Sequence, residues 1–232
     1  MGTHSLSAKY NSVSGALKAS LTGTDYQLPD FGASDAEMLI GRRVALVTTH
    51  GPELPEFDVP LTYLRERGAV VDVVTQDWLF DYQPEAAGMV VLAQWLAVDV
   101  CARADMRISD ANVDDYDAVI IIGGAWNPIM LRSDPAVLRF IRETKSRGVL
   151  IASICHGPQV LISAGAFPSG TDATGVDDIR LDMTNAGFNV LNDPVVYDEV
   201  QSLLTSRNPE TLKEFCVELG KGLLKTPSRT SK

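Results

Sequence analysis

A cysteine and a histidine stand side by side in the segment SICHGPQV, residues 153–160. Cys155 follows a short apolar run that is typical of a buried strand, and Gly157-Pro158 opens a segment with the pattern of a helix. A side chain on such a strand-to-helix turn projects into the open, in the geometry called a nucleophile elbow. The nearby helix N-terminus favours the thiolate and lowers the pKa of a cysteine, and His156 is placed to act as base or acid. The pair predicts a cysteine nucleophile.

Other polar and glycine residues follow neighbouring apolar runs. His50 and Glu53 come after VALVTT (44–49), and the pair Gly123 and Gly124 ends DAVIIIGG (117–124). In open parallel sheets, ligands bind beyond the carboxyl ends of the strands. We therefore expect these residues to lie near Cys155, with His50 lining the pocket. The histidines, cysteine and glutamate concerned do not follow a standard metal-ligand spacing, so neither a metal nor another cofactor is expected.

Strand and helix patterns alternate along most of the chain. Four apolar runs predict strands, at 44–49, 69–75, 117–124 and 149–154. Four amphipathic segments predict helices, at 57–68, 134–148, 176–187 and 208–224, and residues 195–206 predict strands around a turn. This alternation predicts an α/β fold with a mostly parallel sheet covered by helices on both faces. Cys216 falls on the apolar stripe of the last helix and is expected in the core, whereas Cys101 has no assignable role.

One globular domain is expected over residues 42–225. Residues 1–41 are polar with weak periodicity and predict an N-terminal extension. Residues 226–232 are also polar and predict a C-terminal tail. The segment 76–103 fits the alternation poorly and carries aromatic residues, among them Trp78 and Trp95. It predicts either an insertion that walls the site or a local hydrophobic cluster.

Composition limits the classes of partner. The formal net charge of −10 disfavours binding to the negatively charged backbone of a nucleic acid. No apolar run reaches the roughly 18 residues of a membrane-spanning helix, and the first 20 residues lack the apolar core of a secretory signal. Three cysteines suggest no disulfide framework. We expect a cytoplasmic protein that binds a small molecule, and neither nucleic acid nor membrane.

The segment ASICHGPQVLISAG (152–165) resembles the nucleophile segment of the ThiJ/PfpI family, in the class I glutamine amidotransferase-like superfamily. Segments at 60–74, 114–124, 177–187 and 203–215 also resemble family segments in the same order. The resemblance implies a single flavodoxin-like sandwich with Cys155 as nucleophile, and a homo-oligomer, at least a dimer. In this family a glutamate after the first strand hydrogen-bonds the cysteine sulfur. Counting back from Pro60 assigns that role to Glu53, with Glu56 three residues later.

The chain departs from the family pattern after the glycine pair. Peptidase-like members carry an acid there that completes a Cys-His-Glu triad across a subunit interface, but the aligned residue is Pro128. Trp126 and Asn127 replace the usual small and charged residues, so peptidase activity is not expected and both residues are predicted to contact a specialised substrate. Isocyanide-hydrating relatives usually place threonine after the cysteine, so His156 argues against that branch.

These features favour an enzyme in which Cys155 attacks an electrophilic carbon of a small molecule, as a hydrolase or a glyoxalase-like lyase. The alternative is a non-catalytic redox or carbonyl-stress sensor or chaperone, since an exposed cysteine of low pKa oxidises readily. Turnover of small aldehydes or amides separates the two. Which acid orients His156 stays open at this point.

Overall fold

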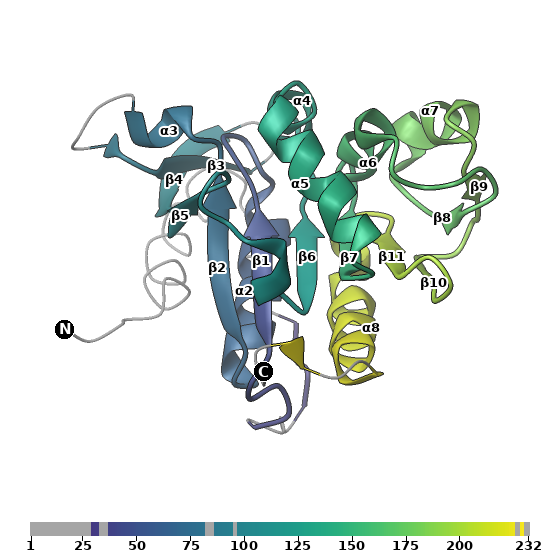
Figure 1. The fold of residues 1–232 in the computed structure, drawn as a ribbon, viewed down its shortest axis with the longest axis horizontal. Helices are drawn as coiled ribbons and strands as arrows, with labels where there is room; N and C mark the ends of the chain where they lie inside the picture. The colour runs from purple at the N-terminus through teal and green to yellow at the C-terminus, as the bar shows by residue number, and fades with distance from the viewer. Residues whose placement is uncertain (1–28, 33–36, 82–85, 95–96, 226–227, 230–232) are drawn as a thin grey trace.

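The computed structural model describes residues 29–32, 37–81, 86–94, 97–225 and 228–229 (Figure 1). Most of the predicted extension at 1–41, most of the tail and Trp95 therefore lie outside the described residues.

The described part of the chain forms one seven-stranded sheet with the order β10-β11-β7-β6-β1-β2-β5. Every neighbouring pair is parallel except β10 and β11. The strands are β1 Arg43–Val47, β2 Val70–Thr75, β5 Met106–Arg107, β6 Ala118–Ile121, β7 Leu150–Ile154, β10 Val195–Asp198 and β11 Leu203–Ser206. The prediction of a mostly parallel sheet is confirmed.

Helices cover both faces because successive strand residues point to opposite sides. In β1, Val44 and Leu46 join the core cluster that contains the apolar residues of α2 and α8, whereas Ala45 and Val47 join the cluster of α5 and α6. Strands buried in this way read as continuous apolar runs. These helices are α2 Leu54–Glu66, α5 Pro135–Ser146, α6 Pro158–Ala164 and α8 Leu212–Lys225. Cys216 of α8 is fully buried, as its place on the apolar stripe predicts.

Shorter elements connect these layers. They are α3 Trp78–Asp81, α4 Asn127–Leu131, α7 Arg180–Asn185, the strands β8 Asp172–Ala173 and β9 Asn189–Val190, and the 3-10 turns η2 Val113–Asp115, η3 Asp177–Ile179 and η4 Pro209–Thr211. The helix predicted over 176–187 is therefore split into η3 and α7. The helix predicted to start at Phe57 starts at Leu54 instead, a shift that affects the site.

The segment 76–103 folds as α3 followed by a hairpin of β3 Met89–Gln94 and β4 Ala97–Arg103. This antiparallel pair is separate from the main sheet. It is tied to the loop after β1, because Val91 donates its N–H to His50 Nδ1 at 3.0 Å and its carbonyl accepts the Gly51 N–H at 2.8 Å.

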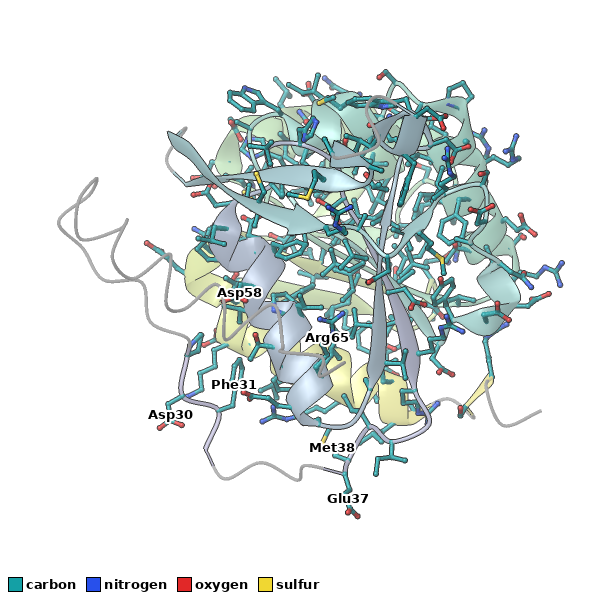
Figure 2. All side chains as sticks on the ribbon, turned by 90° about the vertical axis from the view of Figure 1, so that its left-hand side faces the viewer. Asp30, Phe31, Glu37, Met38, Asp58 and Arg65 are labelled. Carbon is teal, nitrogen blue, oxygen red and sulfur yellow. The ribbon has the colours of Figure 1, made fainter. Side chains whose placement is uncertain are left out.

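The described residues before β1 pack on the domain. Leu39 is fully buried, and the Phe31 and Tyr63 ring centroids lie 4.8 Å apart with the Arg67 guanidinium over both rings. Figure 2 shows Phe31 and Met38 near the end of α2 that carries Arg65. Among the described helices, none is long and apolar enough to cross a membrane.

Candidate active site

Cys155 occupies the sharp turn between β7 and α6. Its φ is 60°, a left-handed conformation that L-residues rarely adopt, and its N–H donates to the Ser206 carbonyl of β11 at 2.9 Å. Gly157 makes the turn possible, because a Cβ there would lie 2.5 Å from both the Ile121 carbonyl and Ser153 Oγ. The elbow geometry predicted from the sequence is present.

His156 links Cys155 to an acid that the sequence did not reveal. Its Nδ1 lies 3.3 Å from Cys155 Sγ, and its Nε2 lies 2.9 Å from Asp178 Oδ2. An N–H at Nε2 that donates to the carboxylate leaves Nδ1 as the acceptor that faces the thiol. Asp178 belongs to η3, which is tied to the elbow because Val176 donates its N–H to the Cys155 carbonyl.

No spacing rule identifies Asp178 in advance. It lies 22 residues after His156, and its approach depends on the path of the loop between α6 and η3. The only sequence signal for this role is that Asp177 and Asp178 begin the segment 177–187, which resembles a segment of the ThiJ/PfpI family.

The carboxyl group that contacts the sulfur belongs to Glu56, and this corrects the assignment of that role to Glu53. Glu56 is fully buried, its Oε2 accepts the Gly123 N–H at 2.8 Å, and its side chain hydrogen-bonds Cys155. Because α2 starts at Leu54, Glu56 lies in the first helical turn and faces the core, whereas Glu53 precedes the helix. Pro55 at the start of the helix is the sequence signal for this earlier boundary.

Burial changes the protonation of the Cys155–Glu56 pair. The pKa of Glu56 is raised from its ordinary value of 4.5 to about 8, mainly by desolvation and also by Glu53, against the hydrogen bonds with Cys155 and the Gly123 N–H, which lower it. Desolvation also raises the pKa of Cys155, and an ionised Glu56 adds to this, whereas the N–H groups of His156 and Gly124 lower it. The sequence predicted a lowered pKa from the helix terminus alone, without this desolvation. Near neutral pH, Glu56 is protonated and can donate to the sulfur.

The glycine pair brings two backbone N–H groups to the site. Gly123 donates to Glu56, and Gly124 donates to the sulfur. Gly124 has a φ of 94°, and a Cβ there would lie 2.6 Å from the Glu53 nitrogen, so the close approach of the two loops requires glycine. Both glycines therefore shape the site, as the strand-end argument predicts.

Cys155 opens into a cavity of about 240 Å³. The described residues that line it are Glu53, Glu56, Gly124, Ala125, Cys155, His156 and Pro209. His50 lines a different cavity, of about 690 Å³, with Trp78, Met89 and Cys101. The sequence predicted that His50 lines the pocket of the nucleophile and that the segment 76–103 either walls that pocket or forms a local hydrophobic cluster. In the described residues, His50 and Trp78, Met89 and Cys101 of this segment line the second cavity instead.

The structure contradicts the predicted substrate contact of Asn127, whereas that of Trp126 stays a prediction. Asn127 is fully buried, and its amide accepts from the Thr49 N–H and Thr48 Oγ1 and donates to the carbonyls of Ile122 and Gly123. With its hydrogen-bonding groups occupied, Asn127 cannot contact a substrate, and it holds the glycine loop in place instead. The half-exposed Trp126 packs its ring against Gly51.

Within the described residues, no group of three histidine, cysteine, aspartate or glutamate side chains is placed to hold a metal ion. The described site brings together the Cys155 thiol, the His156 imidazole and the carboxyl groups of Glu53 and Glu56, with Asp178 against His156.

Comparison with family models, curated proteins and solved structures gives matches to the same family. A model described as the DJ-1/PfpI family matches residues 42–221. General stress protein 18 of Bacillus subtilis and protein/nucleic acid deglycase 2 of Escherichia coli are 34% and 31% identical over 176 residues, 76% of this chain and 94% of each relative. A solved two-domain protein of Anabaena variabilis, with DJ-1/ThiJ/PfpI-like and ferritin-like domains, is 31% identical with a TM-score of 0.69. That match covers 81% of this chain and 50% of the two-domain protein.

Proposed function

Because the chain belongs to the DJ-1/PfpI family, we propose that it is a cysteine-dependent enzyme acting on an electrophilic carbon of a small molecule, as a hydrolase or a glyoxalase-like lyase. The observation that carries this proposal is the chain of contacts from Cys155 Sγ through His156 to Asp178. A nucleophile, a base within reach and a third group that orients the base are the parts required for nucleophilic catalysis.

The first step is attack of Cys155 on a carbonyl carbon. His156 Nδ1 takes the thiol proton, the sulfur electron pair forms the C–S bond, and the π pair of the C=O bond moves to oxygen. Glu56, protonated because its pKa is raised to about 8, is placed to give its proton to that oxygen. The N–H groups of His156 and Gly124 that lie beside the sulfur add stabilisation of negative charge.

Both candidate reactions then pass through a thioester. For an ester or amide, collapse of the adduct expels the leaving group, which takes the proton from His156. For a 2-oxoaldehyde, the hydrogen of the former aldehyde carbon moves to the neighbouring carbon and the hydroxyl proton of the hemithioacetal moves to the ketone oxygen, which gives a thioester of a 2-hydroxy acid. The proton that His156 took from the thiol then passes to the Glu56 carboxylate, so that His156 is neutral again. In each case water attacks the thioester with His156 as base, and His156 gives the proton to the departing sulfur, which restores the thiol.

Two further observations support a small carbonyl compound as substrate. The cavity of about 240 Å³ is below the size of ordinary drug-binding sites, so it suits a compact molecule better than a folded protein segment. The relative from Escherichia coli is named a protein/nucleic acid deglycase, which is consistent with a carbonyl-derived substrate.

The test is turnover of a panel of 2-oxoaldehydes, thioesters and amides by the wild type and two cysteine variants. Cys155→Ala should lose activity by about 1000-fold or more, because the nucleophile is removed. Cys101→Ser is the matched control, since this exposed thiol lies at the other cavity, and it should keep full activity. Unchanged turnover by Cys155→Ala contradicts the proposal. Absence of turnover on the whole panel, with reversible oxidation of Cys155, favours the sensor alternative instead.

A further inference from the structure

We infer that the larger cavity, beside the β3–β4 hairpin, is a second binding site, for a neutral, planar and mostly apolar small molecule that carries a hydrogen-bond acceptor. Its volume of about 690 Å³ lies within the range of roughly 300–1,000 Å³ that small-molecule sites occupy. No described residue lines both this cavity and the cavity of Cys155. The assignment is therefore independent of the proposed function.

The β3–β4 hairpin is apolar on both of its faces. Val90 and Leu92 are buried in the core cluster that contains α2. Successive strand residues point to opposite sides, and the alternate residues Met89 and Val91 line the cavity together with Cys101, the partner of Val91 in β4. A ribbon that faced only water on this side would carry polar residues there, so the apolar face indicates an occupant.

The helix α3 and the loop after β1 complete the described wall, and α3 lies beside the hairpin (Figure 1). The ring of Trp78 stands near edge-to-face with that of His50, with 5.6 Å between the centroids, and remains 39% exposed. Seven described residues line the cavity, whereas a protein interface takes roughly 20–30 residues a side. The hollow therefore fits one small molecule better than a partner protein.

His50 supplies a fixed hydrogen-bond donor. Val91 donates its N–H to His50 Nδ1 at 3.0 Å, so the neutral imidazole carries its proton on Nε2. Desolvation lowers the pKa of His50, which keeps the ring neutral near pH 7. None of the described residues accepts a hydrogen bond from Nε2. The proton on Nε2 is therefore available to an acceptor on a ligand.

The other lining groups define the rest of the ligand. The described wall has no carboxylate, amide, hydroxyl, lysine or arginine side chain, and besides His50 its polar groups are the indole N–H of Trp78 and the thiol of Cys101. A charged ligand would lose its hydration there without an ionic partner. A flat ring system would instead gain contact with Trp78 and Met89. A neutral aromatic molecule with a carbonyl oxygen meets these requirements.

The test uses 6-propionyl-2-dimethylaminonaphthalene, a neutral planar fluorophore with one ketone oxygen. Its emission brightens and moves to shorter wavelength in an apolar site, and moves back to longer wavelength when the ketone accepts a hydrogen bond. A fixed micromolar concentration of this probe is titrated with the full-length protein. At the usual binding energy per non-hydrogen atom, the dissociation constant should be on the order of 100 µM. The measurement involves no turnover, so its failure leaves the proposed function untouched.

Three variants locate the probe. Cys101→Trp fills the cavity from its strand wall and should weaken binding about tenfold or more. Leu181→Trp is the matched control, because it adds the same side chain at an exposed position of α7, outside the described wall, and it should leave the dissociation constant unchanged. His50→Phe keeps an aromatic ring beside Trp78 but removes the donor. It should weaken binding about fivefold and move the emission of the bound probe to shorter wavelength.

Four results overturn the inference. The first is binding that Cys101→Trp leaves unchanged, because the probe then sits elsewhere. The second is loss of binding in Ile129→Asp, which tests the exposed apolar surface of α4. The third is the same emission maximum in the wild type and in a folded His50→Phe. The last is a wild type that does not bind the probe, or binds it only on dilution because a second copy of the chain covers the cavity. Circular dichroism checks the fold of each variant, and where His50→Phe unfolds, Cys101→Trp decides alone.

Discussion

Glu53 and Glu56 are three residues apart, yet the structure gives them different environments. Glu56 is fully buried against Cys155 and holds its proton to about pH 8, whereas Glu53 is only half-buried in the wall of the cavity. A buried carboxyl group that stays protonated near neutral pH is suited to the role of proton donor. Counting back from Pro60 assigned the sulfur contact to Glu53, but Glu56 makes it, because α2 starts at Leu54 and turns Glu56 toward the core.

Replacing Glu56 by Gln should flatten the pH dependence of folding stability. The folded-state pKa of Glu56 is raised from 4.5 to about 8, so the folded protein keeps a proton that the unfolded chain releases. This contribution to stability is complete below pH 4.5 and is lost as pH rises to 8, by up to ~5 kcal/mol at 1.36 kcal/mol per pKa unit. Urea unfolding from pH 4.5 to 9 should show this fall in the wild type and in Glu66→Gln but not in Glu56→Gln. Parallel curves for the wild type and Glu56→Gln refute the prediction.

Asp178 should matter for turnover and not for substrate binding. In Asp178→Asn the new amide can donate to His156 Nε2, which favours the tautomer whose proton lies on Nδ1 and faces the sulfur. We expect kcat to fall about 10- to 100-fold with KM nearly unchanged, a smaller loss than for a buried triad acid because the Asp178 side chain is 67% exposed. The neighbouring exposed Asp177, changed to Asn, is the control and should stay within twofold of the wild type. An equal loss in both variants points to a general effect of charge at η3.

At the scale of elements, the sequence predicted the sheet better than the site. Strands buried on both faces leave continuous apolar runs, so β1, β2, β6 and β7 were recognised to within a few residues. Helix starts leave weaker signals, and α2 was predicted to start at Phe57 although it starts at Leu54. The sulfur contact was assigned to Glu53 by counting back from Pro60 along the resemblance, and this count missed Glu56 by three residues. The contact with Asp178 and the burial of Asn127 depend on how loops from separate elements meet, which no local pattern encodes.

The elbow between β7 and α6 should carry measurable backbone strain. Cys155 has a φ of 60°, where a residue with a Cβ costs about 1–2 kcal/mol relative to glycine. Cys155→Gly should therefore be more stable to urea than Cys155→Ala by about 1 kcal/mol. Ser202, with a φ of 51° in the turn between β10 and β11, is the comparison site, and Ser202→Gly should exceed Ser202→Ala by a similar amount. Equal stability of the two variants at 155 would mean that the turn relaxes when the thiol is removed.

At the scale of the whole molecule, the family resemblance leads us to expect a homo-oligomer. We expect the subunit interface on the surface near the active site. The side chains of Trp126 and Ile129 are 42% and 57% exposed, and Ile129 belongs to α4, which follows the glycine loop of the site. Large apolar side chains grouped on one surface often mark an interface. A two-fold dimer that used this surface would bring two active sites near each other across the symmetry axis.

Light scattering coupled to size-exclusion chromatography should give at least a dimer at micromolar concentration. Ile129→Asp adds a charge to a surface that two copies would bury together, so it should shift the protein toward monomer by tenfold or more in dissociation constant. Leu181→Asp is the matched control, because Leu181 in α7 is 69% exposed and lies on a different element. It should leave the mass unchanged. A monomeric wild type contradicts the expected assembly, and a dimer that dissociates with Leu181→Asp but not with Ile129→Asp moves the interface from α4 to α7.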